Sequence, residues 1–134
     1  MQADTHTFTG TFTHTLSDGN ANEEILVCLY DTSAYVGGTM TVWMGVETDL
    51  TNNYGVAEYA IASHDADGSS SANMTQVKHY DAAEGLNPIT QGAKASIKVG
   101  SPNQVELMIY HTVAPAFPTG TKFTGRFRLS LLPL

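Results

Sequence analysis

Residues 4–16 read DTHTFTGTFTHTL. Threonine occupies every odd position from 5 to 15, while the even positions carry two histidines, two phenylalanines, a glycine and a leucine. Side chains two residues apart share a face of a β-strand, so this alternation predicts one long strand with a hydroxyl face and an apolar face. Gly10 at its middle indicates a bulge, a bend or the close approach of another backbone.

The rest of the chain consists of short apolar segments separated by turn-forming residues. The run at 25–30 shows no alternation and is too short for a helix, so we interpret it as a central strand covered on both faces. Further strands are predicted over residues 40–46, 56–63, 74–80, 93–99, 105–110 and 122–132, with loops at 49–55, 64–71 and 81–92. The sequence therefore predicts an all-β antiparallel sandwich or jelly roll of about eight strands.

The chain length of 134 residues suits a single domain over residues 1–134, with residues 1–16 as an extended N-terminal β arm. A core of this size needs no disulfide or metal, and no cofactor is expected. The only cysteine, Cys28, lies inside the apolar run with no basic residue before Lys78. We expect it to behave as a small buried hydrophobe rather than as a nucleophile.

The net charge of −7 is distributed unevenly along the chain. Residues 1–77 carry ten acidic side chains and no Lys or Arg, whereas residues 78–134 carry all six basic side chains against three acidic ones. Nucleic-acid binding is not expected, because it needs a concentrated basic footprint. Two interpretations stay open: head-to-tail attraction between copies or with a partner, or a fold that mixes the two halves in space.

The first residues, MQADTH, lack the basic and apolar regions of an export signal, and no apolar run reaches membrane-spanning length. We therefore expect synthesis in a cytoplasm and no association with a membrane.

Catalytic motifs are absent from the sequence. There is no Gly-x-Ser-x-Gly elbow, no phosphate-binding glycine loop and no zinc spacing among the five histidines, so we expect no enzyme activity. Asp65 and Asp67, followed by Gly68, resemble the start of a calcium loop but lack the remaining ligands. They are weak metal candidates, and a solvated turn is the favoured interpretation.

Tyr35 and Tyr54 fall in predicted loops, where aromatic rings often serve recognition. The chain's tryptophan and tyrosines could include a surface that stacks against sugars; they are Trp43, Tyr30, Tyr35, Tyr54, Tyr59, Tyr80 and Tyr110. The alternative is that they close the loops over the open ends of the sandwich.

The Thr- and Gly-rich strands, the apolar strand at 25–30 and the terminal strand FTGRFRLSLL at 123–132 resemble small β-structured proteins of tailed-phage virions. The resemblance is to capsid decoration (cement) proteins and, equally, to the receptor-binding tips of tail fibres. It covers the whole chain in style but rests on no specific motif, so no site residues are carried over. It implies a virion location after synthesis in the host cytoplasm, and a homo-oligomer, commonly a trimer.

Within that resemblance, the first expectation is a non-enzymatic decoration protein that binds the major capsid protein or another virion protein and stabilises the shell. The strand 4–16 would add to a neighbour's sheet through backbone hydrogen bonds. The residues expected to contact partners are Thr5, Thr7, Phe8, Thr9, Thr11 and Phe12 of this strand and Leu132 and Leu134 of the apolar chain end. The alternative is a tail-fibre or carbohydrate-binding module that recognises host glycans through Tyr35, Tyr54 and the loop 64–73.

Overall fold

The computed structural model describes residues 4–17, 23–66, 69–81, 88–111 and 117–134. Within these ranges the chain forms strands and no helix, so none of the described residues belongs to a helix able to span a membrane. The strands are β1 (His6–Thr15), β2 (Glu24–Asp31), β3 (Tyr35–Val46), β4 (Tyr54–Ala66), β5 (Ser69–Asp81), β6 (Ile89–Lys98), β7 (Ser101–His111) and β8 (Lys122–Pro133).

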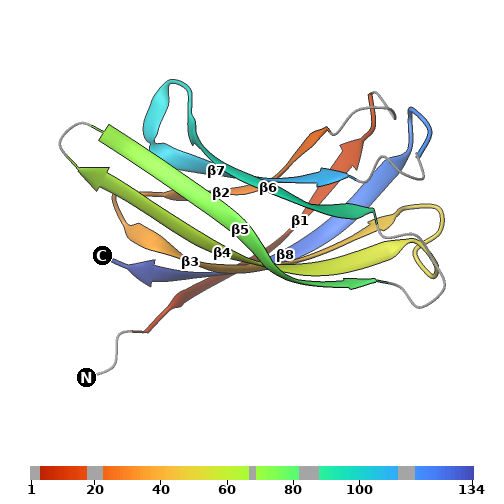
Figure 1. Cartoon of the computed structure of the whole chain (residues 1–134), viewed down its shortest axis with the longest axis horizontal. Coiled ribbons are helices and arrows are strands. Elements are labelled where there is room, and N and C mark those ends of the chain that lie inside the picture. The colour runs from red at the N-terminus through yellow and green to blue at the C-terminus, as the bar shows by residue number, and fades with distance from the viewer. Residues whose placement is uncertain (1–3, 18–22, 67–68, 82–87, 112–116) are drawn as a thin grey trace.

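The strands form two antiparallel sheets that pack face to face (Figure 1). The larger sheet has the order β1-β8-β3-β4-β5, and the smaller has the order β2-β7-β6. Hydrophobic side chains from both sheets fill the space between them, as expected for a sandwich. The predicted all-β sandwich is confirmed.

Strand β1 is an edge strand of the domain's own five-stranded sheet. It pairs with β8 over its whole length, from His6 opposite Leu131 to Thr15 opposite Lys122. The described part of the expected N-terminal arm therefore does not extend away from the domain. The apolar side of β1 explains this placement, because Phe12 and Leu16 are buried in the core.

Two glycine–phenylalanine pairs pack between β1 and β8. Gly10 lies opposite Phe127, and Phe12 lies opposite Gly125, with no register shift between the two strands. A Cβ added at Gly10 would lie 2.7 Å from the Phe127 ring, and one at Gly125 would overlap the Phe12 ring. The expected close approach at Gly10 is thus made by a side chain rather than by a backbone, and neither glycine forms a bulge.

Strand β2 differs from its prediction as a central strand. It is an edge strand of the smaller sheet, and Leu26 and Leu29 are 43% and 38% exposed. A register shift between Leu26 and Cys28 changes the alternation, so that Ile25, Val27 and Tyr30 are the buried residues. The sequence shows no period of two because the outward residues Leu26 and Leu29 are themselves apolar and because the bulge interrupts the alternation.

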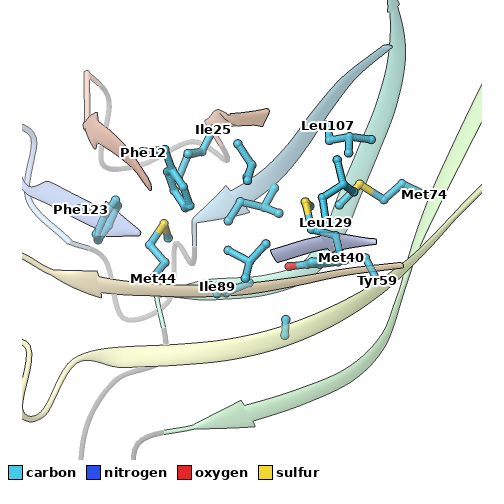
Figure 2. Close-up of a cluster of buried hydrophobic side chains, with 14 of the residues drawn as sticks. Phe12, Ile25, Met40, Met44, Tyr59, Met74, Ile89, Leu107, Phe123 and Leu129 are labelled. Atoms are coloured by element: carbon cyan, nitrogen blue, oxygen red, sulfur yellow. The ribbon is translucent and has the colours of Figure 1, made fainter. Parts of the chain in front are cut away.

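The core lies between β3 and β4 of the larger sheet and β7 of the smaller one (Figure 2). Strand β3 contributes Met40, Val42, Met44 and Val46, as predicted, and all four are buried. Gly37 and Gly38 near its start have φ angles of 127° and 156°, which favour glycine. They bring β3 close to the backbones of β4 and β8, where a Cβ would collide with carbonyl oxygens.

Two predicted strand boundaries differ from those in the structure. Strands β4 and β5 pair from Gly55 opposite Asp81 to Ala66 opposite Ser69, so most of the loop expected at 64–71 is strand. Val99, predicted to face inward with Ile97, is 96% exposed because β6 ends at Lys98.

The fold mixes the acidic and basic halves of the chain. Lys94 of β6 lies 3.0 Å from Glu24 of β2, and Lys78 of β5 is opposite Glu58 of β4. Of the two interpretations of the charge asymmetry, this ion pair and this strand register support spatial mixing.

Candidate ligand-binding face

The outer face of the five-stranded sheet carries the polar half of each alternating strand. On β1 the threonines at 7, 9, 11 and 13 are exposed there. On β8 the outward side chains include Arg126 and Arg128, both exposed. The strand register sets Arg128 between Thr9 of β1 and Thr41 of β3, and it sets Arg126 between Thr11 and Trp43.

A hollow of about 490 Å³ lies on this face across β1, β8, β3 and β4. Within it, the hydroxyls of Thr7 and Ser130 are 3.3 Å apart. The polar side chains that line the hollow are Thr7, Thr39, Thr41, Glu58, Arg128 and Ser130. The hollow therefore offers hydroxyls, a carboxylate and a guanidinium to a ligand rich in hydrogen-bonding groups.

An aromatic pair lies on the same face beside Arg126. The ring centroids of Trp43 and Tyr54 are 6.3 Å apart, with an angle of 30° between the ring planes. A Cβ at Gly45 would lie 3.2 Å from the Trp43 indole, so glycine leaves room for this ring. Tyr54, expected in a loop, is the first residue of β4. Trp43 is among the aromatic residues considered for stacking, and the structure places it on the outward side of β3.

Tyr35 does not join this aromatic pair. Its hydroxyl lies 2.9 Å from Nδ1 of His6, and its ring contacts Phe8 edge to face at 6.0 Å. Tyr35 lies at the start of β3, whereas Tyr54 is opposite Gly45 near the end of β3. The sugar-stacking surface predicted from the two tyrosines is therefore not assembled.

An apolar cleft of about 260 Å³ opens between β1 and β2. Phe8 lines it and is 44% exposed, and Cys28 lines it as well. Burial raises the pKa of the Cys28 thiol to about 12, so the thiol is protonated and unreactive at neutral pH. This agrees with the expectation of an inert cysteine.

The remaining residues expected to contact partners differ in exposure. Phe12 is buried over Gly125 and is not exposed to a partner, which corrects that part of the prediction. Thr5 precedes β1 and is exposed. Leu132 and Leu134 are also exposed, and the Leu134 amide donates a hydrogen bond to the Ala34 carbonyl, which fastens the chain end to the domain.

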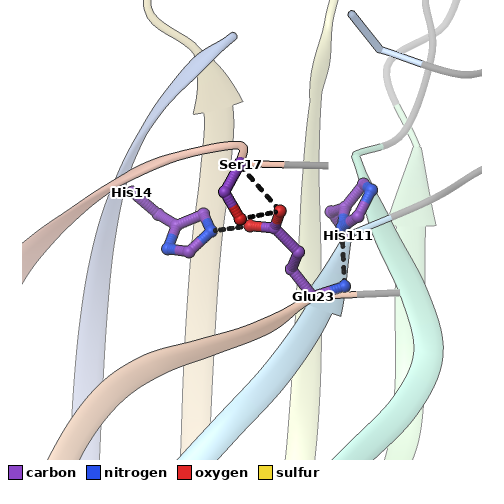
Figure 3. A network of polar contacts seen from close by, with 4 residues as sticks. All are labelled: His14, Ser17, Glu23 and His111. Atoms are coloured by element: carbon purple, nitrogen blue, oxygen red, sulfur yellow. Dashed lines mark hydrogen bonds and ion pairs between the residues drawn. The ribbon is translucent and has the colours of Figure 1, made fainter. Parts of the chain in front are cut away.

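A polar network links the end of β1 to the start of β2 and the end of β7 in the smaller sheet (Figure 3). His14 Nε2 lies 2.7 Å from Glu23 Oε2, while Ser17 donates to Glu23 Oε1 from both its amide and its hydroxyl. The Glu23 amide in turn donates to Nδ1 of His111 at 3.1 Å.

The network contains the residue types of a hydrolase triad in a different order. In a triad the serine hydroxyl is bonded to the imidazole, which accepts its proton. Here the Ser17 hydroxyl and the His14 imidazole both bind the Glu23 carboxylate, from its two oxygens. The serine hydroxyl is therefore not bonded to the imidazole as in a triad, and the contacts link the end of β1 to the residue before β2.

Metal ligands are not gathered within the described part of the chain, where no three His, Cys, Asp or Glu side chains form a group. Asp67 and the side chain of Asp65 lie outside the described residues.

No protein-family model and no curated protein matches the sequence. Among solved structures, the chain is similar to the tailspike protein of Acinetobacter baumannii phage AM24, with 13% identity and a TM-score of 0.56. It is also similar to the tailspike protein of Acinetobacter phage vB_ApiP_P1, with 14% identity and a TM-score of 0.53. The matches cover 98% and 92% of this chain but 27% and 22% of the two tailspike chains. At these identities the likeness is one of fold.

Proposed function

We propose that this chain is a non-enzymatic module of a phage tailspike or tail fibre that binds a glycan on the host surface. The observation that carries the proposal is the outer face of the larger sheet, where a hollow with hydroxyl, carboxylate and guanidinium groups adjoins an aromatic pair. The similarity in fold to two phage tailspike proteins supports the tail assignment.

The chemistry of a sugar fits the groups on this face. A pyranose presents hydroxyls at its rim and apolar C–H groups on its flat faces. Glu58 accepts hydrogen bonds from sugar hydroxyls, Arg128 donates to them, and the threonines do both. Trp43 and Tyr54 supply aromatic surface for the C–H groups.

The tail assignment replaces capsid decoration as the favoured role. Decoration was expected because residues 4–16 were interpreted as an arm free to join a neighbour's sheet. Residues 6–15 instead pair with β8 of the same domain. Two solved structures similar in fold are phage tailspike proteins.

One observation supports the non-enzymatic part of this proposal. In the His14–Ser17–Glu23 network, the carboxylate takes the serine hydroxyl that a catalytic imidazole would need.

Binding to a panel of capsular and O-antigen polysaccharides from bacteria tests this function. The purified chain should bind members of the panel without releasing reducing ends, and Trp43→Ala should weaken that binding about tenfold through loss of stacking. Tyr110→Ala, on the smaller sheet, is the matched control and should bind as the parent does. Binding to empty capsids with no binding to any polysaccharide would restore the decoration role.

A further inference from the structure

Cationic side chains gather on the outer face of the five-stranded sheet. By strand register, Lys122, Arg126 and Arg128 of β8 face outward with the β1 threonines, and Lys78 of β5 is opposite the outward Glu58. Four of the six Lys and Arg residues of the chain thus lie on one face. Among the described side chains of these strands, Glu58 is the one carboxylate that accompanies them.

This face contrasts with the charge of the whole chain. The net charge is −7, yet the outward side chains that the structure describes on the larger sheet carry four positive charges against one negative charge. Within the described part of the chain, no carboxylate holds the guanidinium of Arg126 or Arg128 in an ion pair, and both residues are exposed. The two guanidinium groups are therefore available to an anionic ligand.

The spacing of the two arginines suits a polymer. They are two residues apart on one face of β8, or about 7 Å along the strand. Hydroxyl side chains of Thr9 and Thr11 on β1 flank them on one side, while Thr41 and Trp43 on β3 flank them on the other. A guanidinium binds a carboxylate through two parallel N–H···O bonds, which fixes orientation as well as adding affinity.

We propose that the glycan recognised by this face is acidic, and that its sugar carboxylates pair with Arg126 and Arg128 while its hydroxyls meet the flanking threonines. This inference rests on the proposed function and specifies its ligand class. The bound chain runs along β8 and β3, from the 490 Å³ hollow beside Arg128 to the Trp43–Tyr54 pair beside Arg126.

Carboxyl reduction provides the test. An acidic polysaccharide that binds the protein is treated so that its carboxylates become alcohols, which preserves the sugar framework and removes the charge. The untreated polymer should bind, and the reduced polymer should bind about tenfold more weakly or not at all. Binding of the untreated polymer should also weaken as salt is raised from 0.05 to 0.5 M, because exposed charges are screened.

Substitutions locate the effect on β8. Arg128→Ala and Arg126→Ala should each weaken binding of the acidic polymer about tenfold, and Arg128→Lys should fall between because it keeps the charge without the bidentate fork. Lys98→Ala, on the smaller sheet, is the charge-matched control and should bind normally. These positions are exposed, so the melting temperatures of the variants should equal that of the parent.

The outcomes separate this inference from the proposed function. Equal binding of the untreated and the reduced polymer, unaffected by the arginine substitutions, would overturn the acidic-ligand inference and leave glycan recognition standing. Equally tight, salt-sensitive binding to duplex DNA would also overturn it, by showing a general polyanion surface. Failure to bind any polysaccharide in the panel would overturn the proposed function itself.

Discussion

The inner and outer faces of the five-stranded sheet use alternate residues of the same strands for different purposes. On the inner face, Phe12 fills the space that Gly125 leaves, and Phe127 fills the space at Gly10. On the outer face, the neighbours of these residues are threonines and two exposed arginines. Adjacent residues of β8 thus have different roles: Gly125 and Phe127 determine stability, whereas Arg126 and Arg128 are available for recognition.

The contrast teaches that stability and binding can be altered separately in this domain. Inward substitutions should change the free energy of unfolding, whereas outward ones should leave it nearly unchanged. Each of the following substitutions tests or refines that separation.

The largest effect is expected for Gly125→Val. Its side chain would occupy the place of the Phe12 ring, which must then leave the core. We expect a loss of about 3 kcal/mol or more in the free energy of unfolding, measured by urea denaturation. Gly120→Ala is the control, because nothing lies within 4 Å of a Cβ there and only the φ of 90° opposes the change. A loss below about 1 kcal/mol for Gly125→Val would show that the two faces are not so different.

Two phenylalanines on one strand give the next comparison. Phe12 is 8% exposed and Phe8 is 44% exposed, although both belong to the apolar side of β1. Phe12→Ala should cost about 3 kcal/mol because it leaves a cavity, and Phe8→Ala should cost about 1 kcal/mol or less. Similar losses of unfolding free energy for the two variants in urea denaturation would contradict the different burial of Phe8 and Phe12.

The His14–Glu23 contact should contribute less to stability than the packing of Phe12 against Gly125. Glu23→Gln removes the negative charge of Glu23. The substitution weakens the 2.7 Å contact with His14 and the two hydrogen bonds that Ser17 donates to the same side chain. We expect a loss of about 1–2 kcal/mol at neutral pH. A double-mutant cycle with His14→Ala should give a coupling energy of about 1 kcal/mol, and additive losses would show that the contact is not formed in solution.

The smallest effect is expected for Asp31, an exposed residue at the end of β2. Hydrogen bonds from the side chain and the backbone of Ser33 hold the pKa of its carboxyl below the ordinary value of 3.8. The stabilisation is complete above the unfolded pKa and is lost as the pH falls through the lowered folded pKa. Asp31→Asn should therefore slightly lower the melting temperature at neutral pH and reduce its decline below pH 3.8. An unchanged acid profile would show that these hydrogen bonds add nothing to stability.

The sequence predicted β1 and β3 well because strict alternation reports which residues face the core. It misjudged β2, because Leu26 and Leu29 are apolar although exposed, and the bulge between Leu26 and Cys28 interrupts the alternation. Of the candidate site, the sequence pointed to the β1 threonines as partner contacts and to Trp43 and Tyr54 as stacking residues, but not to the two arginines. The neighbours Trp43 and Arg126 are far apart in the sequence and meet only through the pairing of β3 with β8, which the period of each strand does not reveal.

The pairing of His6 with Leu131 brings the beginning of β1 and the end of β8 to within about 5 Å of each other. A longer polypeptide could therefore enter and leave this domain at almost the same point, with little change to its own path. Such a unit can be exchanged between larger proteins by recombination without rebuilding the surrounding chain. The surface it presents can then diversify independently of the protein that carries it.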